Sequence, residues 1–294
     1  MRVSLFGPTT VELADGTVVT DLGGIKPRQV LEMLALSVGT PVSKERLADQ
    51  LWNGEPPRSY IGTLESYMSL IRRRLNVARG RGSAIATTSA GYVLDPLQVE
   101  VDVDQFRRLV QPTARTAPST LLARTQEATQ LVTGDLVAGE AYADWAVTER
   151  TLFSSEFVLA CQRGAETALD LGQPDAAVEL ARRAIRCDPV NETSWQLLIR
   201  GLGAAGARNE ALRAYLDFRR ILVDELGSEP GPATRALYLE LLQDDADSAA
   251  TQATPSEVKV LLRLLRNALE TIPGVDLPRS DNSLGEIAAL VGAA

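Results

Sequence analysis

The sequence contains no histidine, and its 294 residues include only two cysteines. The absence of histidine excludes Ser/His/Asp and Cys/His catalytic arrangements, histidine metal ligands and the usual proton shuttle at neutral pH. Cys161 and Cys187 are too few for a zinc cage, and we expect both to be buried among apolar helical residues. Neither phosphate-binding motif, GxxxxGK[ST] or GxGxxG, occurs. We therefore predict a protein that is not an enzyme and that binds no cofactor and no metal.

Long hydrophobic runs are missing as well. No apolar segment approaches the ~18 residues of a membrane-spanning helix, and the first residues lack the pattern of a secretory signal. We therefore expect a cytoplasmic protein that does not associate with membranes. The composition, 45% hydrophobic and 23% charged, is that of an ordinary globular protein, and the length predicts two compact units with a tail.

Positive charge is scarce overall but concentrated in one region. The net charge of -8 and the isoelectric point of 4.9 argue against nucleic acid as a partner. Between residues 56 and 82, however, Glu65 is the one acidic residue among six arginines, which are Arg58, Arg72, Arg73, Arg74, Arg79 and Arg81. The chain therefore has a small basic region on an acidic molecule.

The first hundred residues predict short strands, three helices and a hairpin. Strands are expected at 3–6, 10–13 and 17–19, with Asp15-Gly16 as a hairpin turn. The first helix begins near Pro27 and ends near Gly39, and the second follows an N-cap at Ser43. Two β-prone segments, 85–88 and 92–94, then flank a turn of small residues. This order is that of a winged helix-turn-helix.

The third helix, from about Ser59 to Asn76, has one apolar and one small, basic face. Its apolar residues recur at helical spacing and are expected to form the buried face: Ile61, Leu64, Met68, Ile71 and Leu75. On the same wheel Ser66, Ser69 and Arg73 lie opposite, Thr63 and Arg74 lie on one flank, and Arg72 lies nearer the apolar edge. The exposed face is therefore predicted to combine short side chains with arginine.

The rest of the chain is predicted to be largely helical and contains a repeat. The segment from Leu171 to Ala177 aligns with the segment from Ala205 to Ala211 at an offset of 34, which is the tetratricopeptide (TPR) period. Such helix pairs stack into a solenoid, because one pair cannot bury its apolar faces alone. Residues 244–255 are small, polar and acidic and are interpreted as a linker. Residues 256–294 are predicted to form an amphipathic helical tail.

Several segments together carry a family resemblance. In the first hundred residues these are Leu5-Phe6-Gly7-Pro8, Lys26-Pro27-Arg28-Gln29, Leu47–Trp52, Tyr67–Leu75 and Gly91–Leu94. Later in the chain they are Trp145-Ala146, Glu149-Arg150, Gly172, Gly206, Leu226-Gly227 and Glu229–Pro232. Residues 1–100 resemble an OmpR/PhoB-type winged-helix DNA-binding domain, and residues 101–243 resemble the α-helical, TPR-like bacterial transcriptional activator domain of Streptomyces antibiotic regulatory proteins. The expected fold is therefore mostly α with a small β content.

The resemblance implies a transcriptional activator that binds direct repeats in double-stranded DNA near promoters. It also implies a homodimer on the DNA, recruitment of RNA polymerase through its sigma factor or alpha subunit, and a secondary-metabolite pathway as the target. The chain would then associate with the nucleoid when bound to DNA.

The candidate DNA contacts lie on the third helix and beside it. We expect Arg73 to reach a base edge and Arg72 and Arg74 to hold phosphates. Arginines at the end of a helix also occur as a solvated end that complements the helix dipole.

Hydroxyl and aromatic side chains complete the predicted site. Thr63, Ser66 and Ser69 are expected to face the groove, where short side chains permit close approach to bases, although they also fit an ordinary helix surface. Trp52 is assigned either to the core or to a phosphate through its indole N–H. Tyr92 is predicted as a DNA contact, with packing on the third helix as its structural alternative. Val93 stands where response regulators commonly place a wing arginine, although Arg79 and Arg81 are close enough in sequence to reach neighbouring phosphates.

A second function class fits part of the same pattern. The acidic net charge and the absent wing arginine favour a TPR-like adaptor that binds proteins through its solenoid groove and DNA weakly or not at all. Stable protein partners in the absence of DNA binding would distinguish this adaptor from the regulator.

Overall fold

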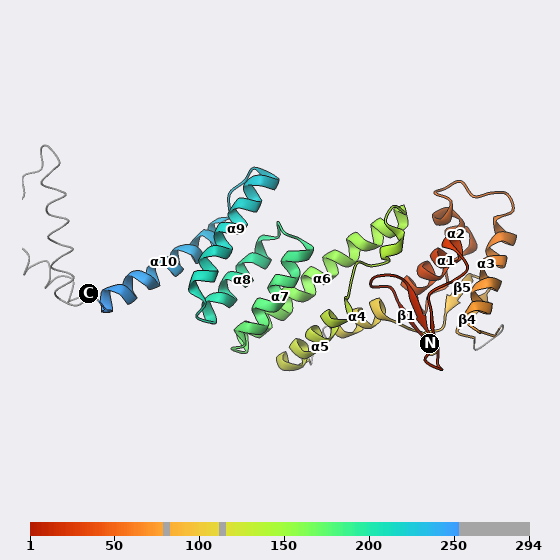
Figure 1. Cartoon of the computed structure of the whole chain (residues 1–294), viewed down its shortest axis with the longest axis horizontal. Helices are drawn as coiled ribbons and strands as arrows, with labels where there is room; N and C mark the ends of the chain where they lie inside the picture. Colours follow the sequence, from red (N-terminus) through yellow and green to blue (C-terminus); the bar gives the residue numbers. More distant parts are fainter. Residues whose placement is uncertain (79–82, 112–115, 253–294) are drawn as a thin grey trace, which may run out of the picture. The chain divides into compact units, whose positions relative to one another are not determined.

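The computed structural model describes residues 1–78, 83–111 and 116–252 of the chain (Figure 1). Residues Met1–Tyr238 form one compact unit, and a second unit begins at Leu239. Among the described residues, no helix has both the length and the apolar character needed to cross a membrane.

The chain begins with a four-stranded sheet in the order β3-β2-β1-β6. Its strands are β1 (Arg2–Ser4), β2 (Thr10–Glu12), β3 (Val18–Val19) and β6 (Glu100–Val101). The predicted hairpin turn is confirmed, because the Thr17 N–H donates to Asp15 Oδ1 at 2.9 Å and Gly16 has a φ of +82°. Strand β6, which pairs in parallel with β1, was not predicted. Exposed Glu100 lies between buried Val99 and Val101, but Asp102 is also buried, so the alternation is too short to mark a strand in the sequence.

The predicted order of three helices and a hairpin is confirmed. The elements are α1 (Ile25–Leu36), α2 (Lys44–Leu51), α3 (Tyr60–Arg74), β4 (Ile85–Thr88) and β5 (Gly91–Leu94). Ser43 caps α2 as expected, since its Oγ accepts from the Arg46 N–H at 3.1 Å. The hairpin is held against Val42 by two backbone hydrogen bonds. The Val42 N–H donates to the Tyr92 carbonyl at 2.8 Å, and the Tyr92 N–H donates to the Val42 carbonyl at 3.0 Å.

The buried face of α3 matches its sequence pattern except at one end. Leu64, Met68, Ile71 and Leu75 are each at most 2% exposed. Ile61 is 46% exposed, which corrects its assignment to the core. The helix begins at Tyr60, so Ile61 belongs to the first turn, and Leu64 is the first α3 residue to reach the core.

The remainder of the described chain is helical and contains the predicted repeat. Its elements are α4 (Asp102–Val110), α5 (Pro118–Leu131), the 3-10 turn η1 (Ala138–Glu140), α6 (Asp144–Asp170), α7 (Pro174–Cys187), α8 (Glu192–Ala204), α9 (Arg208–Leu226) and α10 (Pro232–Gln252). Helices α6 to α9 pack in sequence order, each on the next. The turns of the two repeats contain Gly172 and Gly206, with φ of +67° and +73°. Equal turns 34 residues apart confirm the helix-pair repeat.

The predicted linker begins inside a helix. Helix α10 continues to Gln252, so residues 244–252 of the linker predicted at 244–255 are helical. Residues 244–252 contain alanines and neither glycine nor proline, so nothing in them ends a helix that has already formed. The amphipathic tail predicted for 256–294 lies outside the described residues.

The winged helix and the helical repeat are joined by backbone and side-chain contacts within the first unit. Asp102 accepts hydrogen bonds from the N–H groups of Leu5 and Phe6 at 2.8 and 3.1 Å. Arg28 of α1 forms a salt bridge of 2.6 Å with the buried Glu140 of η1. The two domains therefore share a packed junction.

Candidate nucleic-acid interface

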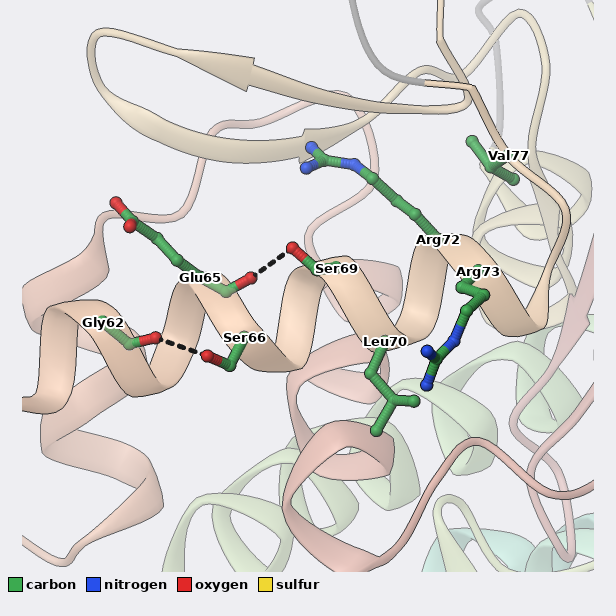
Figure 2. A pocket seen from close by; sticks show the side chains of 8 residues that line it. All are labelled: Gly62, Glu65, Ser66, Ser69, Leu70, Arg72, Arg73 and Val77. Carbon is green, nitrogen blue, oxygen red and sulfur yellow. Dashed lines mark hydrogen bonds between the residues drawn. The ribbon is translucent and has the colours of Figure 1, made fainter.

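One side of α3 presents short side chains and an arginine to solvent (Figure 2). Gly62, Ser66 and Arg73 are exposed and Ser69 is half-buried, at spacings that place them along one stripe of the helix. With Glu65, Leu70, Arg72 and Val77 they line an open hollow of 680 Å³. A surface built this way admits close approach of another molecule along the helix.

The predicted hydroxyl groups donate to the helix that carries them. The Oγ1 of Thr63 and the Oγ atoms of Ser66 and Ser69 donate to carbonyls one turn earlier, at 3.2, 2.9 and 2.8 Å. The hydroxyl oxygens of Thr63 and Ser66 keep lone pairs that can accept from a base N–H. Thr63 is half-buried on the flank of the stripe.

The structure corrects the role predicted for Arg72. Its side chain is turned toward the hairpin, away from Arg73 (Figure 2), and the residue is 8% exposed. Its guanidinium donates to the Ile85 carbonyl at 3.0 Å and to Thr87 Oγ1 at 2.9 Å. Because this guanidinium is buried and occupied by two acceptors on β4, we assign Arg72 to positioning the hairpin instead of to a phosphate.

The structure also corrects the prediction of Tyr92 as a DNA contact, because this residue is 2% exposed. The Arg72 guanidinium carbon and the Lys44 Nζ lie 6.0 and 5.8 Å from its ring centre. Burial raises the pKa of the Tyr92 phenol. Tyr92 therefore packs between α3 and the start of α2, which is the structural alternative considered for it.

The other two predicted arginines are exposed. Arg73 forms no ion pair within the part of the chain that the structure describes, and its guanidinium is turned away from the hairpin (Figure 2). Arg74 makes a salt bridge of 3.1 Å with Asp21, which is itself exposed. A solvated pair of this kind contributes little stability, so Arg74 can exchange Asp21 for another anion at small cost.

Trp52 is half-buried where α2 ends. Lys26 donates to the Leu51 carbonyl and places its Nζ 5.9 Å from the Trp52 ring centre. On the hairpin Val93 is half-buried, and Arg79 and Arg81 lie outside the described residues.

A charged pair that sequence reasoning missed lies beside the exposed stripe. Lys44 at the first position of α2 bonds Glu65 of α3 at 2.7 Å, and this hydrogen bond raises the pKa of the Lys44 ammonium. Only the packing of α2 on α3 reveals the pair, because its members are far apart in the sequence. A carboxylate on such a face can accept from the N4 amine of cytosine in a major groove.

The described residues contain no site for metal chemistry. No group of three histidine, cysteine, aspartate or glutamate side chains among them is placed to hold a metal ion. Both cysteines are free; Cys161 is buried, as expected, but Cys187 is exposed, which corrects the expectation for that residue. Cys187 is the last residue of α7.

Comparison with known proteins places this geometry in a family. Residues 24–94 match the family model described as "Transcriptional regulatory protein, C terminal", and residues 101–242 match "Bacterial transcriptional activator domain". The Regulatory protein DnrI of Streptomyces peucetius is 31% identical over 261 residues, which cover 83% of this chain and 93% of DnrI. The chain belongs to the Streptomyces antibiotic regulatory protein family. It is thus a member of a family of transcriptional regulators with a winged-helix DNA-binding domain.

Other members and a solved structure agree with this assignment. The Transcriptional regulator RedD of Streptomyces coelicolor is 27% identical, with 83% of this chain and 71% of RedD covered. The Regulatory protein AfsR of the same species is 28% identical, and the match covers 87% of this chain but 26% of AfsR. Mycobacterium tuberculosis EmbR, solved in complex with a low-affinity phosphopeptide, has the same fold, with a TM-score of 0.67 at 24% identity over 92% of this chain and 72% of EmbR.

Proposed function

We propose that this family member is a sequence-specific activator that reads DNA through the exposed stripe of α3. One observation carries the proposal: Arg73 is exposed and free of ion pairs among the described residues, on a helix surface otherwise built from Gly62, Ser66 and Ser69. A recognition helix enters the major groove, where arginine pairs with guanine and small side chains permit close approach.

Three neighbouring groups complete the proposed contact surface. Arg74 on α3 and the indole of Trp52 at the end of α2 would hold phosphates. Thr63 would approach the groove from its flank. Arg72 contributes indirectly, because it ties the hairpin to the helix that reads the bases.

The wider function follows from the family. Direct repeats near promoters, a homodimer on those repeats and recruitment of RNA polymerase through its sigma factor or alpha subunit are parts of the proposal, as is the control of a secondary-metabolite pathway. The match of residues 101–242 to an activator domain supports them. Such a regulator would act in the cytoplasm, where the promoter DNA lies.

In vitro selection of binding sites followed by affinity measurements tests the proposal. Purified full-length chain should recover a repeated sequence motif from random duplexes. Arg73→Ala should weaken binding to that motif and lower the slope of log affinity against log salt by about one unit if the arginine holds a phosphate, and less if it reads a base. Arg124→Ala, an exposed arginine on α5, is the matched control. Recovery of no motif, or equal affinities for the three proteins, would contradict the proposal.

An adaptor function is the second candidate. It is favoured by a hollow of 390 Å³ between α7, α8 and α9, lined by Trp195 and by three arginines against two acidic residues: Arg182, Arg186, Arg213, Glu210 and Asp217. A solenoid groove of this kind suits an acidic peptide. Stable capture of a protein partner by a chain that recovers no DNA motif would favour the adaptor over the activator.

A further inference from the structure

A third hollow, of 560 Å³, lies in the helical repeat beside its contact with the winged helix, because the loop that lines it is bonded to Phe6. Its walls come from three segments: the loop 132–136 after α5, one side of α6, and the C-terminal end of α7. Cavities at domain junctions with an apolar floor and a few polar groups are the usual sites of small ligands.

The floor of this junction cavity is aromatic. Phe153 and Phe157 of α6 line it, and both are less than 10% exposed. Phe153 also packs on Phe6 and Phe106, with ring centres 4.9 and 5.1 Å apart. The floor is therefore rigid and apolar, and it suits a flat hydrocarbon body.

The rim of the junction cavity is positively charged. Arg150 and Arg183 are held in place by backbone carbonyls, the latter by Thr129 at 2.7 Å. Arg186 is exposed and forms no ion pair among the described residues. Asp135 is the one acidic residue that lines the cavity. Arg183 is also paired with Glu179 at 3.4 Å, so the three arginines exceed Asp135 and Glu179 by one positive charge, and a guanidinium fork matches a carboxylate.

We infer that the junction cavity binds a small aromatic carboxylate. The ring would lie on Phe153 and Phe157, and the carboxylate would pair with Arg186.

The loop that walls the cavity is also bonded to the winged helix. The Gly7 N–H donates to the Asp135 carbonyl at 2.9 Å, the Val137 N–H donates to the Leu5 carbonyl at 2.8 Å, and Thr133 Oγ1 donates to the Phe6 carbonyl. A ligand that displaces this loop would shift the winged helix against the repeat. This effect on DNA affinity rests on the proposed function, whereas the binding site does not.

Alkylation of Cys187 by N-ethylmaleimide provides a direct test with the native full-length chain. Cys187 lines the cavity, with its Sγ 2.8 Å from Ser154 Oγ. Cys161, the other cysteine, is buried, and burial raises the pKa of its thiol to about 12, so it does not react in the folded protein. The labelling rate therefore reports access to Cys187, which lines the junction cavity and also a neighbouring hollow of 340 Å³ between α6 and the end of α7, so the Arg186→Ala comparison assigns the protection to the junction cavity.

We expect 2-naphthoate at millimolar concentration to slow labelling at least threefold, and the neutral 2-naphthamide to slow it much less. Arg186→Ala should abolish the protection by 2-naphthoate. Arg182→Ala, on the same helix but outside the cavity and paired with Glu210, should retain it. Labelling at the same rate with and without 2-naphthoate, or equal protection in the wild type and Arg186→Ala, would overturn the inference.

The DNA-affinity readout separates this inference from the proposed function. If 2-naphthoate protects Cys187 but the chain recovers no DNA motif, the site stands and the proposed function fails. If the chain binds its motif and 2-naphthoate gives no protection, the function stands and the site fails.

Discussion

At the scale of single residues, two adjacent arginines have opposite roles. Arg72 is buried against the hairpin and Arg73 is exposed on the recognition face. The sequence placed Arg72 near the apolar edge of the helix, but its burial could not be predicted. The Arg72 side chain is buried because it donates to the Ile85 carbonyl and to Thr87, and only tertiary folding brings these acceptors next to Arg72. Tyr92 is similar, because its neighbours come from two helices distant in sequence.

Replacing Arg72 should therefore cost stability. In Arg72→Met the Ile85 carbonyl loses both guanidinium donors. The carbonyl keeps the Ser83 hydroxyl as a donor at 3.2 Å, but losing hydrogen bonds from a charged donor costs roughly 1.5–3 kcal/mol. Urea unfolding should show this decrease in the free energy of unfolding, while Arg73→Met should leave it nearly unchanged. Equal stabilities of the two variants would argue against a positioning role for Arg72.

Glu65 should limit binding to arbitrary DNA. Its carboxylate faces the same hollow as Arg73 and neutralises Lys44. In Glu65→Gln one negative charge is removed and the Lys44 ammonium becomes available, so affinity for random duplexes should rise several-fold at low salt. Fluorescence anisotropy measures this, with Glu166→Gln, an exposed site on α6, as the control. An unchanged affinity of Glu65→Gln for random duplexes would show that Glu65 does not lie at the DNA interface.

At the scale of elements, the sequence predicted the helices and the hairpins well, because their periods and turn residues are local. It missed β6, whose two residues are a strand only through pairing with β1. It also interpreted 244–252 as part of a linker from composition, although α10 continues through it. Both misses concern segments whose state is decided by a neighbour and not by their own pattern.

Helix α3 offers a test in which stability and binding change in opposite directions. Gly62 lies in the helix on the exposed stripe, and a Cβ there would meet no atom within 4 Å. Gly62→Ala should raise the free energy of unfolding by about 0.5–1 kcal/mol, because alanine loses less conformational freedom in a helix. It should also weaken DNA binding if bases approach the helix at this point.

Thermal or urea unfolding and DNA anisotropy on the same Gly62→Ala sample provide the two readouts. A variant that is both more stable and fully able to bind DNA would show that the first turns of α3 do not meet the groove.

The hairpin has a stricter glycine requirement. Gly91 has a φ of +132°, and a Cβ there would lie 2.0 Å from the Val42 carbonyl oxygen. The close approach permits the two backbone hydrogen bonds between Val42 and Tyr92. This glycine therefore fixes the hairpin against the start of α2.

At the scale of the whole molecule, the winged helix and the repeat meet around buried carboxylates. Glu32 of α1 is 0% exposed and accepts from Thr9 at 2.5 Å, while Arg28 bridges it to Glu140 of η1. Burial, with the nearby Glu140 charge, raises the pKa of Glu32 to about 7, against the opposing effects of Thr9 and Arg28. No sequence pattern predicts this cluster, because its members come from separate domains.

This cluster should make stability depend on pH. The raised pKa of Glu32 means that the folded state holds its proton more tightly than the unfolded state does. The contribution of Glu32 to the free energy of unfolding is therefore complete below about pH 4.5. It is lost as the pH rises toward 7, by up to about 3 kcal/mol. Unfolding of wild type and Glu32→Gln across this range measures the difference. The variant should lack this loss, and parallel curves for the two proteins would contradict the assignment.

The central claim is that the exposed face of α3 reads specific promoter sites, and genome-wide occupancy of the tagged full-length chain tests it most directly. Wild type and Arg124→Ala should give sharp peaks over direct repeats upstream of a few operons. The double variant Arg73→Ala, Arg74→Ala should lose those peaks while remaining folded by circular dichroism. Peaks that persist in the double variant, or a flat profile for folded and expressed wild type, would contradict the account.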